Sequence, residues 1–166
     1  RLPVVDADVV GMFVVASVAT LVGVLWTRQV ERFAIWRLLG WLAPLAGLLL
    51  IALTLPVDQF DLTQWLYLAV IGAGTIVIGR LKVRYELLPW LSMTVCAIMF
   101  GVWIGQVDGR APVAKLAWVA IALGGAYVVG GYISLWRSRR PVIWAGLSAA
   151  AVLGFLLLSY VALVDQ

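Results

Sequence analysis

The acidic residues of this chain are the first candidates for chemistry, and all of them fall near the ends of long apolar runs. The chain has 8 Asp and Glu residues and no His. A proton relay or ion path through a membrane needs ionisable side chains at depth. We interpret these residues as helix caps and loop charges; the alternative is a patch of Asp58, Asp61 and Asp108 that attracts a cation or a basic partner. They are Asp6, Asp8, Asp58, Asp61, Asp108 and Asp165 on one side of the expected helices, and Glu31 and Glu86 on the other.

The hydroxyl and thiol groups offer no activated nucleophile. Lysine can activate a serine when histidine is absent, but Lys82 and Lys115 both fall in connections between apolar runs. The single cysteine, Cys96, lies inside an apolar run and is interpreted as a small packing residue. A chain without histidine lacks the commonest haem and transition-metal ligand. The sequence predicts no cofactor, no metal and no catalytic residue. The serines considered are Ser17, Ser92, Ser134, Ser148 and Ser159.

The composition is that of a membrane protein. Hydrophobic residues make up 64% of the 166 residues and charged residues 12%, about half the charged share of an average soluble domain. Several apolar runs reach about 18 residues, enough to cross a hydrocarbon layer of about 30 Å as a helix. The sequence therefore predicts an all-α, multipass membrane protein.

Cap and proline signals divide the chain into six expected transmembrane helices, which form a single bundle over residues 1–166. Asp8 and Asp61 are suited to cap helix starts. Pro56 ends one helix, and Pro44 is expected to kink it. The expected helices are 9–26, 33–55, 62–79, 87–107, 113–135 and 141–163.

The basic residues predict the orientation. Nine lie in the turns after the first, third and fifth helices or close to them, and three lie on the other side, which is a positive-inside pattern. The basic turns are therefore expected in the cytoplasm and both termini in the periplasm. An even helix number with both ends outside indicates a piece of a longer protein. The nine are Arg28, Arg32, Arg37, Arg80, Lys82, Arg84, Arg137, Arg139 and Arg140; the three are Arg1, Arg110 and Lys115.

The net charge of +4 is not a nucleic-acid signal, because the basic residues cluster in short turns between apolar runs. Lys and Arg at such turns meet anionic lipid headgroups. We therefore expect membrane lipids and other transmembrane segments as partners, and no nucleic acid.

Three tryptophans recur at an equal spacing of 54 residues: Trp36, Trp90 and Trp144. The spacing predicts three parallel hairpin repeats, 9–55, 62–107 and 113–164. Regular helix lengths with tryptophans at both interfaces would give the same spacing without any duplication. These three residues and Trp136 are predicted interface anchors at the basic ends of the helices. Trp65 and Trp118 are expected at the opposite interface, with Trp41 and Trp103 deeper.

The turn Arg139-Arg140-Pro141-Val142-Ile143-Trp144, followed by Ala145-Gly146-Leu147-Ser148, resembles a recurrent unit in a family of large bacterial polytopic inner-membrane proteins of unknown function. The resemblance is best in the last third of the chain. The first unit departs from it, since Phe33 and Ile35 stand where prolines are expected. The resemblance implies a bacterial inner-membrane protein with further helices, and no activity or substrate.

Two stripes of small residues predict close helix packing. Gly101, Gly105 and Gly109 share one face of the fourth expected helix, and Gly146, Ala150 and Gly154 share one face of the sixth. We expect these stripes to pack inside the bundle, so that leucine at position 105 would push two helices apart. Docking of an outside helix is the alternative.

Two functions remain open. The edge-lying charges and the packing stripes favour a structural or scaffolding module within a larger membrane protein or complex. The alternative is a transporter or lipid-handling protein, in which Pro44 and the glycine-rich stretches provide mobility and Trp41 and Trp103 an aromatic site.

Overall fold

The computed structural model describes residues 34–54, 62–106, 113–136, 138 and 140–164. These residues form five α-helices and one short 3-10 helix. The elements are α2 (Ala34–Thr54), α3 (Leu62–Leu81), η2 (Val83–Tyr85), α4 (Leu88–Gln106), α5 (Val113–Leu135) and α6 (Pro141–Val164). Five of the six expected helices are thus present within a few residues of their predicted bounds. The first, 9–26, lies outside the described residues.

Within the described part of the chain, four helices are long and apolar enough to cross a membrane: Leu62–Leu81, Val83–Gln106, Ala114–Leu135 and Pro141–Ala162. Helices suit these segments because an apolar surrounding cannot hydrogen-bond the backbone, which must therefore bond within itself. A shorter apolar stretch, Gly40–Ala52, lies in α2, whose helix continues through Pro44.

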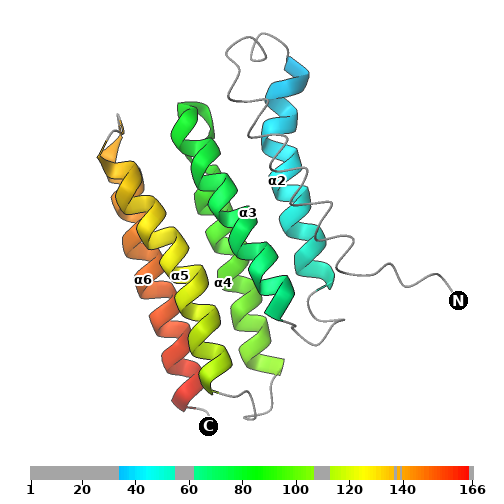
Figure 1. Cartoon of the computed structure of the whole chain (residues 1–166), viewed down its shortest axis with the longest axis vertical. Coiled ribbons are helices and arrows are strands. Elements are labelled where there is room, and N and C mark those ends of the chain that lie inside the picture. Colours follow the sequence, from blue (N-terminus) through cyan, green and yellow to red (C-terminus); the bar gives the residue numbers. More distant parts are fainter. Residues whose placement is uncertain (1–33, 55–61, 107–112, 137, 139, 165–166) are drawn as a thin grey trace, which may run out of the picture.

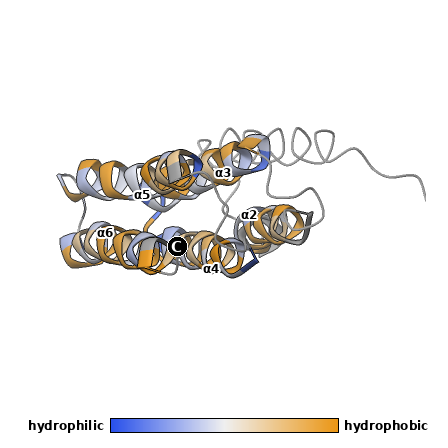
Figure 2. Cartoon of the chain, turned by 90° about the horizontal axis from the view of Figure 1, so that it is seen from below, coloured by the Kyte–Doolittle hydropathy of each residue, from blue (hydrophilic) through white to orange (hydrophobic). Residues whose placement is uncertain are grey.

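The helices run alternately up and down, and they lie in two layers. Figure 1 shows the start of α2, the α3–α4 connection and the α5–α6 connection at one end. Seen along the helices, α3 and α5 form one layer and α2, α4 and α6 the other (Figure 2). The core between them includes Leu68, Ile71, Phe100, Leu123, Tyr127 and Leu147.

The end that carries the two connections is the basic end of the described bundle. Arg80, Lys82, Arg84 and Arg140 all lie there, because α3 ends and α6 begins at it. Lys115, near the start of α5, lies at the opposite end. This grouping agrees with the predicted basic turns. Their other members, Arg28, Arg32, Arg137 and Arg139, lie outside the described residues.

The glycines with the least room for a side chain are not those of the predicted stripes. A Cβ on Gly131 of α5 would collide with Ser148 Oγ and lie 3.1 Å from the Trp144 carbonyl oxygen on α6. A Cβ on Gly72 of α3 would lie 2.6 Å from the hydroxyl oxygen of Tyr127 on α5. The absence of a side chain at these two positions is what lets α5 pack closely against both neighbours.

On α4, the predicted stripe does not form a close helix contact within the described bundle. A Cβ on Gly105 would meet no described atom within 4 Å, and one on Gly101 would meet only Leu158, at 3.7 Å. Among the described residues, Gly105 has no packing partner, and its expected role in internal packing stays a prediction. Gly109 lies outside the described residues.

The α6 stripe is divided between contact and open surface. Gly146 lies beside the Trp90 ring, where a Cβ would be 3.1 Å away, and Ala150 packs against the core. A Cβ on Gly154 would meet no described atom within 4 Å. The stripe thus packs only in the half near the basic end.

The tryptophans expected as anchors have different environments. Trp136 is 88% exposed, as an anchor requires, but Trp144 is 1% exposed and belongs to the core. Trp144 is therefore a packing residue rather than a lipid contact. Trp90 is half-buried, and its indole N–H donates to the Ile143 carbonyl oxygen at 3.2 Å. Trp36 lies in α2, and its side chain is outside the described part.

The hairpins α3–α4 and α5–α6 enter in the same sense, as the three-repeat hypothesis requires of its second and third units (Figure 1). The first unit is described only in its second helix. The duplication itself stays a prediction.

Candidate functional site

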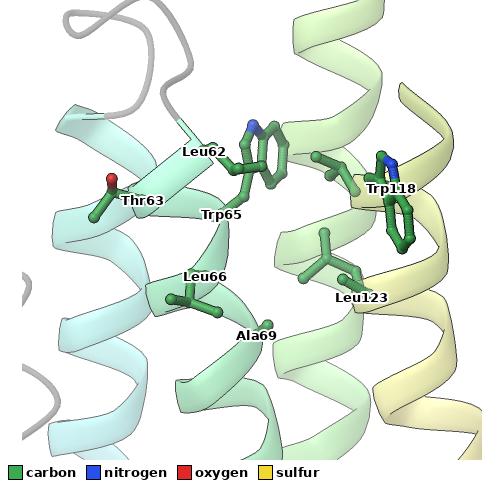
Figure 3. Close-up of a pocket in the computed structure, with 9 residues that line it drawn as sticks. Leu62, Thr63, Trp65, Leu66, Ala69, Trp118 and Leu123 are labelled. Atoms are coloured by element: carbon green, nitrogen blue, oxygen red, sulfur yellow. The ribbon is translucent and has the colours of Figure 1, made fainter. Parts of the chain in front are cut away.

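An apolar groove that could hold a ligand lies between α3 and α5. It has a volume of ≈370 Å³ and opens on the side of the bundle (Figure 3). It lies toward the end opposite the basic end, because its lining comes from the start of both helices. The lining residues are Leu62, Thr63, Trp65, Leu66, Ala69, Trp118, Val119, Ala122 and Leu123.

The lining of the groove includes a small side chain from each of the two helices. Ala69 and Ala122 leave space, while Leu123, fully buried, belongs to the core behind them. Trp118 borders the space and is 69% exposed. Figure 3 shows the Trp65 and Trp118 indoles on the two helices that border the groove. An aliphatic chain or a flat apolar ring fits such a lining, whereas a charged group does not.

Aromatic packing fixes the inner wall of the groove. The Trp65 ring contacts Phe100 edge-on at a centroid distance of 6.1 Å and lies 5.3 Å from Trp103. Phe100 in turn packs against Phe155 of α6 at 5.8 Å. The ammonium group of Lys115 lies over the Trp103 ring, 5.7 Å from its centroid, in the range of a cation–π interaction. Trp103 therefore takes part in packing, and the described structure gives it no role in an open aromatic site.

A hydroxyl–thiol cluster lies at mid-depth between α4 and α5. The Tyr127 hydroxyl is hydrogen-bonded to Ser92 Oγ at 2.5 Å and lies 3.5 Å from Cys96 Sγ. Gly72 admits the tyrosine tip from the α3 side, and Thr75 donates to the Gly72 carbonyl at 2.7 Å. The cluster is buried and its hydroxyl groups are hydrogen-bonded, so its evident effect is to fix three helices in register.

Sequence reasoning placed Ser92 and Cys96 separately and did not pair them with Tyr127. The available signal was their four-residue spacing, which puts both on one helix face. The partner on α5 could not be identified from it, since every face of that helix is apolar.

A polar cavity at the basic end is the second candidate site. It has a volume of ≈140 Å³ and is lined by Gly79, Arg80, Val83, Glu86, Ser134, Ser138 and Trp144. Glu86 is only 5% exposed, which corrects its interpretation as a solvated loop charge. A guanidinium nitrogen of Arg140 lies 4.0 Å from Glu86 Oε2.

The short helix η2 turns Glu86 inward. Tyr85, at its end, is buried against Gly40 of α2, and its ring lies 5.7 Å from that of Trp41. The backbone N–H of Glu86 donates to the Val83 carbonyl at 3.3 Å. With Tyr85 fixed toward α2, the next residue has its carboxylate directed into the bundle.

Among the described residues, no group of three or more His, Cys, Asp or Glu side chains is placed to hold a metal ion. Asp58, Asp61 and Asp108, the expected acidic patch, lie outside the described residues. Lys82 and Lys115 lie at opposite ends of the bundle, near the starts of α4 and α5.

No protein-family model matches this chain, and no curated protein or solved structure matches it either. The resemblance of the last third to a bacterial membrane-protein family therefore stays a prediction.

Proposed function

We propose that this chain is a multipass module of the bacterial inner membrane with a structural, scaffolding role in a larger membrane protein or complex. The observation that supports it best concerns two glycines, on α4 and α6, that no described part of the chain covers. Gly105 and Gly154 meet no described atom within 4 Å, although both lie on apolar helices. Such positions let another helix approach closely and gain dispersion contacts.

The distribution of charge is consistent with this role. Among the residues whose side chains the structure describes, the charged ones are in the connections or within one turn of a helix end: Arg80, Lys82, Arg84, Glu86, Lys115 and Arg140. The middle turns of the described helices therefore consist of uncharged residues. Only 22% of the α6 span is buried inside the bundle, which leaves a wide apolar face for lipid or another transmembrane segment. The basic end is proposed to face the cytoplasm, where Lys and Arg meet anionic headgroups.

Site-specific photo-crosslinking in native membranes tests the scaffold proposal. A photoreactive residue at position 105 or 154 is expected to give discrete protein adducts. The same residue at Ile121 or Val129, which are exposed on α5, serves as the control for random collision. Lipid adducts alone at all four positions would contradict the proposal.

Lipid handling is the second candidate, and the apolar groove between α3 and α5 is the observation that favours it. A space of ≈370 Å³ with this lining is of the size and character that accepts an acyl chain. If the groove serves this purpose, a lipid with an acyl chain in the groove should remain bound after detergent extraction.

A further inference from the structure

The carboxylate of Glu86 lies beside the polar cavity with unused hydrogen-bonding capacity. Glu86 is 5% exposed, and its Oε2 atom makes no hydrogen bond with any residue the structure describes. The Arg140 guanidinium is 4.0 Å from this oxygen, on a side chain that is 66% exposed. This separation is beyond hydrogen-bond range, so the guanidinium does not satisfy the hydrogen-bonding capacity of the carboxylate oxygen. A buried carboxylate in this state is unfavourable until a cation or a donor reaches it.

The cavity has room for such a group. Its volume of ≈140 Å³ exceeds the ~30 Å³ that one water occupies in the liquid. Two hydroxyl groups share the lining. Ser134 donates to the Gly130 carbonyl at 2.6 Å, and Ser138 Oγ accepts from the Arg140 backbone N–H at 3.0 Å. Each keeps a lone pair free, because a hydroxyl oxygen accepts twice. A ligand with several N–H donors would therefore find a carboxylate and two hydroxyl acceptors.

The charges around the cavity select a zwitterion over a simple cation. Arg80 lines the cavity and Arg140 lies next to Glu86, and both are exposed. Two guanidinium groups would repel a metal ion but would bind a phosphate. The cavity also lies at the end of spans long enough to cross a membrane, at the level where phospholipid headgroups are found.

We propose that the polar cavity binds the headgroup of an aminophospholipid in which a primary ammonium is joined to a phosphate, as in phosphatidylethanolamine. The ammonium donates to Glu86, Ser134 and Ser138, and the phosphate contacts Arg80 and Arg140 at the rim. Phosphatidylcholine has no N–H donor and a bulkier cation, so it is excluded from the same position. This inference is independent of the scaffold proposal.

The test uses the whole chain in detergent and compares lipids with identical acyl chains. Native mass spectrometry should give at least about tenfold tighter binding of phosphatidylethanolamine than of phosphatidylcholine. The reason is that phosphatidylcholine cannot make the charge-assisted hydrogen bonds from an ammonium group to Glu86 and the two serines. Stepwise N-methylation of the ethanolamine lipid should weaken binding progressively, with no change in the protein. Equal binding across the methylation series would overturn the proposal.

Two variants assign the effect to the cavity. Glu86→Gln keeps the side-chain size but removes the charge, and it should abolish the preference between the two lipids. Arg84→Gln removes an exposed charge at the same end that does not line the cavity, and it should leave the preference intact. A preference that survives in Glu86→Gln, or that is lost equally in Arg84→Gln, would refute the site.

Competition with soluble phosphoethanolamine distinguishes a lipid ligand from a free soluble one. A large excess of it should displace little bound lipid, since it lacks the acyl chains that hold the headgroup at the membrane level. Complete displacement near equimolar concentration would show that the cavity serves a soluble ligand instead.

Discussion

The Tyr127 hydroxyl and Ser92 Oγ lie 2.5 Å apart inside the bundle, which joins α5 to α4 by a buried hydrogen bond. The tyrosine reaches this position by passing over Gly72. Three helices are thus fixed relative to one another by one side chain.

Replacing Tyr127 with Phe should destabilise the bundle by about 1 kcal/mol. The ring remains, but Ser92 loses its partner, and interhelical hydrogen bonds in membranes contribute about 0.6–2 kcal/mol. Unfolding in mixed detergent micelles measures the change. Tyr132→Phe is the matched control, because Tyr132 lies on the same helix and is exposed. Equal effects of both variants would show that the buried hydroxyl adds no stability.

Gly131→Ala should be more damaging than Gly125→Ala. The new methyl group at Gly131 would collide with Ser148 and the Trp144 carbonyl, whereas one at Gly125 meets no described atom within 4 Å. Overpacking of this kind costs about 1–3 kcal/mol, while Gly125→Ala should be neutral or mildly stabilising. Detergent melting temperatures decide between them. If Gly131→Ala has the same melting temperature as the parent protein, then α5 and α6 are not in close contact at this point.

Filling the apolar groove should remove bound lipid. Ala122→Leu places a branched side chain in the space between α3 and α5, and we expect one fewer co-purifying lipid by native mass spectrometry. Ala117→Leu, at an exposed position of the same helix outside the groove, provides the control. An unchanged lipid number in Ala122→Leu would argue against an acyl chain in the groove.

Cysteine labelling tests the proposed orientation. In a Cys96→Ala background, which removes the buried native thiol, cysteines at positions 84 and 140 should react only after the inner membrane is opened. Cysteines at 61 and 109 should react from the periplasmic side of intact cells. The positive-inside asymmetry is the reason. Labelling of position 84 from outside intact cells would contradict the proposed orientation.

The helix bounds could be predicted from the sequence because the membrane imposes them. Apolar runs of about 18–25 residues become helices, and proline and charged turns mark their ends. For α3, the expectation of 62–79 compares with Leu62–Leu81 in the structure.

The lateral packing could not be predicted in the same way. A helix that is apolar on all faces has no periodic pattern to show which side meets its neighbour. Gly72 and Gly105 therefore look alike in the sequence, although Gly72 receives a tyrosine and Gly105 meets no described atom. Glu86 was misjudged for a related reason: a charged turn predicts solvent exposure, but η2 folds this turn against α2 and directs the carboxylate inward.

The bond from the Trp90 indole to the Ile143 carbonyl has a consequence for the order of assembly. Helices α5 and α6 are joined by a short connection and can pair as soon as both have left the ribosome, since local contacts form first. Trp90, by contrast, must wait in α4 for a partner 53 residues further along the chain. Until then its N–H can find only headgroups or water at the membrane surface. The start of α6 therefore supplies the acceptor for this bond, which adds to the contacts that α5 already makes with α3 and α4.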